Sequence, residues 1–302
     1  MIDHKAQLKQ HELLKSEFMR AKAYAHEYLG ENPLAHFFNT RIRRVSELLT
    51  GFHQGKVLDI GCGPAVVANI FWDKPIEYHG VDISEAMIEV CREGFGNSPQ
   101  FTFSIQEIET LGFADASFDV VLCLGVLEYV LDEPAAIREV ARVLKPGGIL
   151  IATMLNKTSP YELYDHYIHG KLSGGIRKLV RLIRRLAKKR DEMRYVGPKR
   201  PLTRLLGEKA FQKLLTSEGL RVEDTLYYDF HIIPPPMDSI MPRVSLFLSR
   251  NLEFLCRSKL KFLGRGLMVK CRKATAKPMD RGSNLHRSDA RLWAATAEMP
   301  KK

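Results

Sequence analysis

The stretch VLDIGCGPAVVANIF, residues 57–71, decides the fold. Its first four residues are apolar except for Asp59, a composition typical of a buried β-strand. Two glycines follow, Gly61 and Gly63, and then Pro64, a residue that suits the first turn of a helix. We therefore expect a strand, a tight glycine turn and a helix over residues 64–72.

The rest of the chain alternates in the same way as far as residue 273. Strands are expected at residues 56–61, 76–83, 101–106, 118–125, 148–156, 220–231 and 264–273. Helix-like segments separate most of them, and such crossovers make the strands parallel and cover both faces of the sheet. The predicted fold class is α/β: a doubly wound, mostly parallel, seven-stranded Rossmann-like sheet with N-terminal helices (5–29 and 33–50) and helical insertions.

The acid inside the first strand indicates what binds at the glycine turn. A dinucleotide needs a third glycine, but Val66 occupies that position, and Asp59 would repel a pyrophosphate. S-adenosylmethionine (SAM) has no phosphate; its cationic sulfonium and amino groups favour a nearby carboxylate. Asp82, about 20 residues beyond the turn, is placed to accept hydrogen bonds from both ribose hydroxyls. The turn therefore favours SAM as the cofactor.

Four motifs in order carry a family resemblance: VLDIGCGPA, YHGVDIS, LGFADASFDVVLCLGVLEYVLD and IREVARVLKPGGILI. Over residues 45–156 the chain resembles the class I SAM-dependent methyltransferases, and most nearly the enzymes of ubiquinone and menaquinone biosynthesis. The resemblance implies a methyltransferase whose SAM contacts are Asp59, Gly61, Gly63, Asp82, Ile83, Met87, Gln106, Glu107, Ile108 and Leu124. Ala65 stands at the family's usual third glycine, and either Glu107 or Gln106 stands where an aspartate commonly accepts the adenine amino group.

The chain divides into five parts on this interpretation. They are an N-terminal helical cap (1–50), a SAM-binding core (51–156), a basic lid insertion (157–206), a completion of the sheet with a hydrophobic and basic insertion (207–273), and a polar, disordered tail (274–302). The five cysteines show no CxxC pairing and are interpreted as reduced core residues, and no metal site is expected.

The catalytic candidates follow from the needs of methyl transfer. The enzyme aligns nucleophile, carbon and sulfur, and a base is needed only when the acceptor must lose a proton. His231, expected to end the sixth strand at the active-site edge, is the preferred base, and His166 is its rival. Tyr129 replaces a histidine that is frequent in related enzymes. The sequence leaves the identity of the base open.

The net charge of +11 lies almost entirely in residues 171–200, which hold twelve Lys or Arg against two acids, a balance of +10. Apolar residues recur there with helical spacing, as in a basic amphipathic helix that lies on an anionic membrane. We therefore expect a cytoplasmic protein, peripheral at the membrane, that methylates a small hydrophobic acceptor of quinone, isoprenoid or lipid type. No signal peptide or spanning helix is expected at the charged N-terminus or elsewhere.

Three alternatives stay open. A basic stripe is also typical of RNA binding, although no RNA-binding module and no Asn-Pro-Pro-Tyr-type base-methylation motif is present. The same segment fits a plain lid with one solvated face. A third alternative is a SAM-binding protein that no longer transfers methyl groups.

Overall fold

The computed structural model describes residues 17–164, 204–234 and 237–275. The strands are β1 (Gly55–Ile60), β2 (Ile76–Asp82), β3 (Phe101–Ile105), β4 (Phe118–Cys123), β5 (Leu144–Leu155), β6 (Leu220–Tyr228) and β7 (Gly266–Lys273). The α-helices are α2 (Pro33–Leu48), α3 (Glu85–Phe95), α4 (Glu133–Val143), α5 (Pro160–Tyr164), α7 (Glu208–Thr216), α8 (Met237–Ile240) and α9 (Pro242–Leu252). A further helix covers residues 17–27, and η1 (Val66–Phe71), η3 (Glu253–Arg257) and η4 (Lys261–Leu263) are 3-10 helices.

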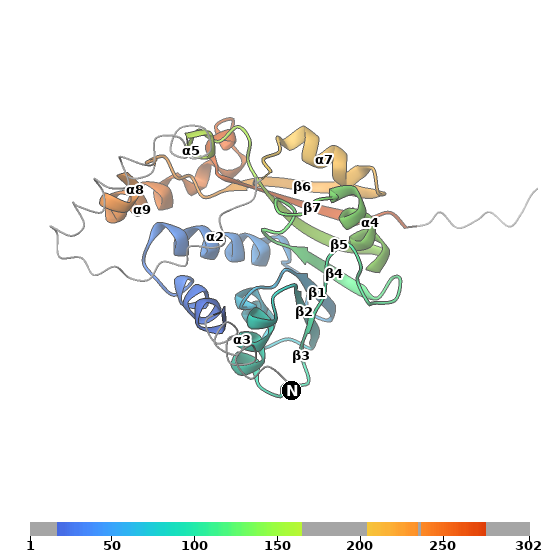
Figure 1. Ribbon diagram of the computed structural model, residues 1–302. Helices are drawn as coiled ribbons and strands as arrows, with labels where there is room; N and C mark the ends of the chain where they lie inside the picture. Colours follow the sequence, from blue (N-terminus) through green and yellow to red (C-terminus); the bar gives the residue numbers. More distant parts are fainter. Residues whose placement is uncertain (1–16, 165–203, 235–236, 276–302) are drawn as a thin grey trace, which may run out of the picture.

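The seven strands form one sheet in the order β3-β2-β1-β4-β5-β7-β6 (Figure 1). Strands β1 to β5 pair in parallel, whereas β7 is antiparallel to both β5 and β6. The predicted doubly wound, mostly parallel, seven-stranded sheet is therefore confirmed. Because β6 runs parallel to β5, six strands point their carboxyl ends at one edge, where ligands bind in such folds.

Alternation along the strands builds two cores, one on each face of the sheet. In β1, Leu58 and Ile60 pack on one face with residues of α4 and α7. Val57 packs on the other with residues of α2, η1 and α3. A central parallel strand is buried on both sides, which explains its nearly continuous apolar sequence. All five cysteines are free and buried, as predicted.

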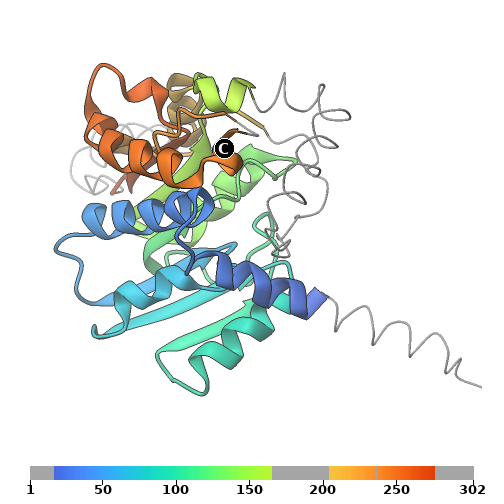
Figure 2. The same cartoon turned by 90° about the vertical axis from the view of Figure 1, so that its left-hand side faces the viewer.

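Helix α2 crosses the second core and brings the N-terminal cap to the sheet. The Asn32 side chain accepts hydrogen bonds from the backbone N–H groups of Leu34 and Ala35, both at 2.9 Å, and Pro33 opens the first turn. In both ribbon views, α2 lies between α9 and the helix over residues 17–27 (Figure 1, Figure 2).

Two expected elements differ from the structure. The helix expected over 64–72 is only η1, because Ala65 has a left-handed backbone (φ 52°) that delays the helix until Val66. The sixth strand, expected to reach residue 231, ends at Tyr228, because Asp229 has a positive φ of 57°.

Two of the expected parts fall largely on undescribed residues. Most of the lid insertion and all of the tail beyond residue 275 lie outside the described residues. Within the described ranges, no helix combines the length and the apolar character needed to cross a bilayer.

Candidate active site

The glycine turn after β1 is shaped for close approach to the backbone. Gly61 has a φ of 66°, and a Cβ at this position would lie 2.2 Å from Val126 Cγ2. Gly63 has a φ of 52° and lies beneath the ring of Tyr24, from the helix over residues 17–27. The Val126 side chain therefore excludes a Cβ at Gly61, a positive φ favours glycine at both positions, and the N-terminal helix contacts the turn through Tyr24.

Asp82, the last residue of β2, joins the turn to the next helix. Its Oδ2 accepts the Gly63 N–H and its Oδ1 accepts the Ser84 N–H, both at 2.9 Å. A carboxylate oxygen has two lone pairs, so each oxygen keeps one for a ligand hydroxyl. Burial raises the pKa of Asp82, although these backbone N–H groups oppose the shift. The half-buried carboxylate is thus held in place to bind a diol.

Asp59 lies under the turn and is buried. The Tyr78 hydroxyl donates a hydrogen bond of 2.5 Å to its Oδ2. Burial raises the pKa of Asp59 to about 7, against the lowering effects of Tyr78 and of the nearby Arg41. The carboxyl therefore changes charge near neutral pH, and a cationic ligand at the turn would favour its ionised form.

A cavity of about 480 Å³ opens beside the turn, at the carboxyl ends of β2 and β3. It is lined by Ile83, Ile105, Gln106, Glu107, Thr110 and Gly112. The Gln106 amide is engaged on both sides: its Oε1 accepts the Gly112 N–H and its Nε2 donates to Ser104 Oγ, each at 2.9 Å. Of the two predicted adenine contacts, Glu107 is therefore the exposed acceptor, and Gln106 shapes the loop.

The remaining predicted cofactor residues divide into two kinds. Met87 lies half-buried in the first turn of α3, where its N–H donates to the side chain of the N-cap residue Ser84 at 3.4 Å. Ile108 and Leu124 have buried side chains that belong to the two hydrophobic cores. The side chains of Ile108 and Leu124 thus pack in the cores beneath the site and do not line the cavity.

Arg41 of α2 is a site residue that the motif analysis missed. Its guanidinium is buried against Phe37 and Phe38, and its Nη1 lies 2.5 Å from where a Cβ on Gly125 would be. Its Nε has no hydrogen-bond partner among the described residues. Burial acts to lower the Arg41 pKa, but Tyr28, Tyr228, Tyr24 and Glu128 outweigh it and the pKa is raised. The result is a fixed cation at the end of β4.

A signal for Arg41 does exist in the sequence. The buried positions of α2 follow helical spacing and are otherwise largely apolar, yet two of them, 41 and 44, are arginines. A cation on the apolar face of a helix indicates a buried anionic partner. For Arg44 that partner is Glu253, at 3.0 Å. For Arg41, the buried acid nearby is Glu128, whose charge contributes to its raised pKa.

His231, the preferred base of the sequence analysis, has a buried side chain. It lies three residues past the end of β6. Its Nε2 is 2.7 Å from Ser245 Oγ on α9, and its Nδ1 is 3.8 Å from Asp229 Oδ1, beyond hydrogen-bond range. The structure thus gives His231 a buried hydrogen-bond partner and places it past the end of the strand that was expected to carry it, while its role as a base stays a prediction.

Asp229, next to this histidine, is the centre of a buried ionic cluster. Its Oδ2 accepts from Arg265 Nη1 at 3.2 Å, and its Oδ1 from Ser249 Oγ at 3.2 Å. Burial acts to raise the Asp229 pKa, but His231, Arg265 and His36 outweigh it and the pKa is lowered. This cluster joins α2, α9 and the end of β6, so it has a structural role.

The other two catalytic candidates have different outcomes. Tyr129 follows β4, and its ring is half exposed at the same sheet edge as Gly125. Its role in catalysis stays a prediction. His166 lies outside the described residues.

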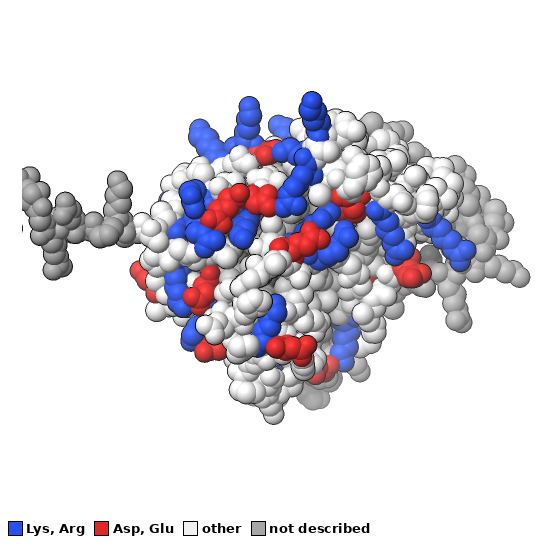
Figure 3. All heavy atoms as spheres, turned by 180° about the vertical axis from the view of Figure 1, so that it is seen from behind, with Lys and Arg blue, Asp and Glu red and all other residues white. Residues whose placement is uncertain are grey.

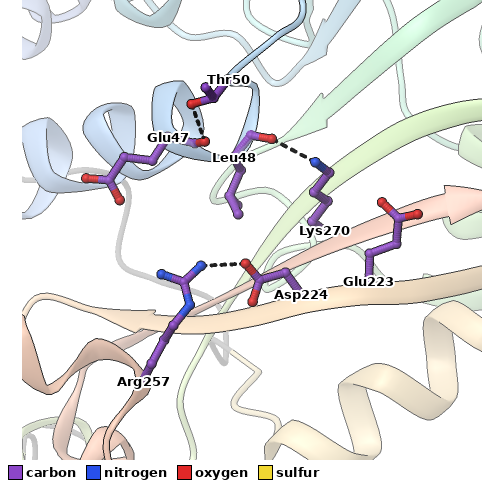
Figure 4. Close-up of a pocket in the computed structure, with 7 residues that line it drawn as sticks. All are labelled: Glu47, Leu48, Thr50, Glu223, Asp224, Arg257 and Lys270. Carbon is purple, nitrogen blue, oxygen red and sulfur yellow. Dashed lines mark hydrogen bonds and ion pairs between the residues drawn. The ribbon is translucent and has the colours of Figure 1, made fainter.

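A second cavity, of about 440 Å³, lies between the end of α2 and strands β6 and β7 (Figure 4). Lys270 Nζ donates to the Leu48 carbonyl at 2.9 Å, and Arg257 pairs with Asp224 across it. It lies part-way along the strands, away from their carboxyl ends. Its lining charges are thus largely satisfied by one another, and it is not part of the site.

The comparisons with known proteins agree with this geometry. Residues 58–152 match a family model described as a methyltransferase domain. This part of the chain, from β1 into β5, is similar to that family. A ubiquinone biosynthesis O-methyltransferase from Idiomarina loihiensis is 34% identical over 131 residues, which cover 42% of this chain and 54% of the relative. Another of that name from Xanthomonas oryzae pv. oryzae is 36% identical over 105 residues, covering 34% and 44%. The match thus spans about half the length of these relatives.

Solved structures extend the likeness in fold over most of the chain. One is a chain in the complex between the Haloferax volcanii Trm112 methyltransferase activator and the putative methyltransferase. It has a TM-score of 0.56 at 17% identity and covers 86% of this chain and 96% of that one. A SAM-dependent methyltransferase from Thermotoga maritima has a TM-score of 0.51 at 17% identity, with coverages of 85% and 97%. At this identity the likeness establishes the fold.

Proposed function

We propose that this protein is a SAM-dependent methyltransferase that acts on a small, hydrophobic acceptor of quinone, isoprenoid or lipid type. The observation that carries the cofactor assignment is the arrangement of Asp82. Its carboxylate is fixed by Gly63 and Ser84 beside a cavity that Glu107 lines, so a ribose and an adenine ring fit side by side. The named methyltransferase relatives support the same assignment.

The opposite charges at the glycine turn fit the other end of SAM. Asp59 supplies a carboxyl for the cationic groups, and Arg41 supplies a buried guanidinium for the α-carboxylate. A charge-assisted hydrogen bond of this kind is among the stronger ones in proteins. When bound, SAM supplies a methyl group already activated by the positive sulfur.

The chain itself has to align the acceptor and exclude water. The helix over residues 17–27 supports the second task, since Tyr24 lies over Gly63 and Lys22 pairs with Glu93 of α3 at 2.6 Å. Tyr129 is the accessible side chain at the β4 edge that can take up or relay an acceptor proton. Positioning then provides most of the catalysis, because the methyl carbon needs no further activation.

The acceptor class rests on two supports. The curated relatives are named for ubiquinone biosynthesis, and the basic, amphipathic segment 171–200 fits an anionic membrane surface. We propose that the enzyme is cytoplasmic and peripheral at that membrane, where it collects a lipid-soluble acceptor.

Isotope labelling tests the proposal. Purified protein is incubated with cell extract and SAM labelled in the methyl group, and the products are separated into organic-soluble small molecules, RNA and protein. Label in an organic-soluble quinone- or lipid-like compound is expected. Label in RNA supports the nucleic-acid alternative, and tight SAM binding without any labelled product supports a non-catalytic SAM-binding protein.

A further inference from the structure

The surface of α8 and α9 carries an unusual concentration of exposed apolar side chains. Of the 17 large hydrophobic residues that are exposed in the described chain, nine lie between residues 232 and 262. Five of them, which we call the apolar stripe, lie on α8, at the junction between the two helices and on α9, and are between 37% and 65% exposed: Met237, Ile240, Met241, Val244 and Phe247. A contiguous apolar surface of this kind marks an interaction site.

The inward face of α9 is mixed: Ser245, Leu246 and Ser249 are buried. Ser245 bonds His231 at 2.7 Å and Ser249 bonds Asp229 at 3.2 Å, both in the buried ionic cluster. Val244 and Phe247 on the outer side are exposed. The hydrogen bonds of Ser245 and Ser249 thus fix the rotation of α9 about its axis, and Val244 and Phe247 face outward.

The charges around the stripe are of one sign. The two acids of residues 237–263, Asp238 and Glu253, are buried and bonded, to Tyr161 and Arg44 respectively. Arg243, Arg250 and Lys259 are exposed and form no ion pair with any described residue. Over the rear face of the molecule, by contrast, acids and cations lie side by side (Figure 3). Within residues 237–263, the exposed charges that form no ion pair with a described residue are therefore positive.

We propose that the α8–α9 face docks on an anionic lipid bilayer, with the apolar stripe in the headgroup region and the three cations on the phosphates. Apolar side chains flanked by cations are the chemistry that an anionic membrane surface binds. A second copy of the chain would bring like charges together, so it fits the face less well. The inference concerns a surface and does not rest on methyl transfer, and its residues are separate from segment 171–200.

Flotation of the full chain with vesicles tests the docking. Binding to phosphatidylcholine vesicles with about a quarter phosphatidylglycerol is expected, with at least about tenfold less binding to phosphatidylcholine alone. The variants Val244→Ser/Phe247→Ser and Arg243→Glu/Arg250→Glu should each lose about tenfold or more. The control Lys209→Glu/Lys213→Glu, a matched charge reversal at exposed positions of α7, should bind within about twofold of the parent.

A local probe separates this face from the basic segment. Phe247→Trp should gain fluorescence quenching by brominated lipids over the parent, whereas Ala210→Trp on exposed α7 should not. Vesicle binding that Val244→Ser/Phe247→Ser leaves unchanged would overturn the proposal and assign docking to residues 171–200. Absence of quenching at Phe247→Trp, or binding to RNA in place of vesicles, would overturn it as well.

Discussion

At the scale of single residues, the acids of the candidate site lie on β1 and β2, and its buried cation lies at the end of β4. Asp59 and Asp82 lie at the ends of β1 and β2, and Arg41 reaches the end of β4 from α2. A zwitterionic ligand with a diol can satisfy all three at once. The spacing of the glycines and acids predicted the first two residues, because strand ends that follow one another in this fold meet at one edge. Arg41 belongs to a helix outside the motifs, so its place depends on tertiary packing.

Replacing Asp82 by alanine should weaken SAM binding by about 1.5–3 kcal/mol, the range for hydrogen bonds to a charged group. This corresponds to a loss of roughly 10- to 150-fold in affinity, measured by calorimetry. Glu77→Ala, which removes an exposed acid from the start of the same strand, is the control and should bind SAM normally. Unchanged affinity in Asp82→Ala, or tight NAD binding by the parent, would exclude the assignment.

Asp59→Asn should raise the thermal stability of the protein at pH 8 and weaken its binding of SAM. Burial raises the pKa of Asp59 to about 7 from its ordinary value of 3.8, so the folded state holds the proton more tightly than the unfolded chain does. This group therefore lowers stability as pH rises from about 4 to about 7. The asparagine variant should gain thermal stability relative to the parent at pH 8 but not at pH 4, while binding SAM more weakly. Equal differences in melting temperature at both pH values would contradict this.

His231→Ala is expected to affect folding and not chemistry. The substitution removes the buried partner of Ser245 and leaves a cavity, at a cost of about 1–3 kcal/mol. Turnover of the folded protein should stay within about threefold, against the roughly 10²–10⁴-fold loss of a general base. The measurement combines denaturant unfolding with methyl transfer to the acceptor that labelling identifies. A loss of about a hundredfold at unchanged stability would restore His231 as the base.

At the scale of elements, the strands predicted most accurately are those whose sequence is determined by burial alone. A parallel strand buried on both faces reads as an apolar run, so β1 and β4 were located to within two residues. The start of η1 and the end of β6 were predicted wrongly because they depend on backbone angles, which the spacing of apolar residues does not reveal. Ala65 and Asp229 adopt positive φ, and each one shifts an element boundary, which in the second case moves His231 from a strand end into the interior.

Helix α2 offers a test of how an element serves the site. Asn32→Ala removes both hydrogen bonds of its N-cap and should cost about 1 kcal/mol of stability, measured by denaturant unfolding. Asn32→Asp keeps the acceptor and should retain that stability. Because α2 carries Arg41, SAM affinity should fall in the alanine variant and not in the aspartate one. Equal unfolding free energies for the alanine variant and the parent would show that the cap does not hold the helix.

At the scale of the whole molecule, the proposed ligand contacts structures that are far apart in sequence. Arg41 belongs to the N-terminal cap, Gly61 and Gly63 to the first turn, and Glu107 to the loop after β3. A ligand that binds these parts only when they are assembled stabilises the entire fold. Cofactor binding and global unfolding are therefore linked, and the linkage is measurable without knowing the acceptor.

Thermal unfolding with and without SAM gives that measurement. At a SAM concentration of 100 times its dissociation constant, the stabilisation is about 2.7 kcal/mol. For a domain of this size the melting temperature should rise by roughly 5–10 °C. The same concentration of NADH should produce no shift, because Asp59 disfavours a pyrophosphate at the turn. In Asp82→Ala the SAM shift should shrink to about half or less, since the dissociation constant rises at least about tenfold. A full shift in that variant would mean that SAM binds elsewhere on the protein, and the site at the glycine turn would have to be abandoned.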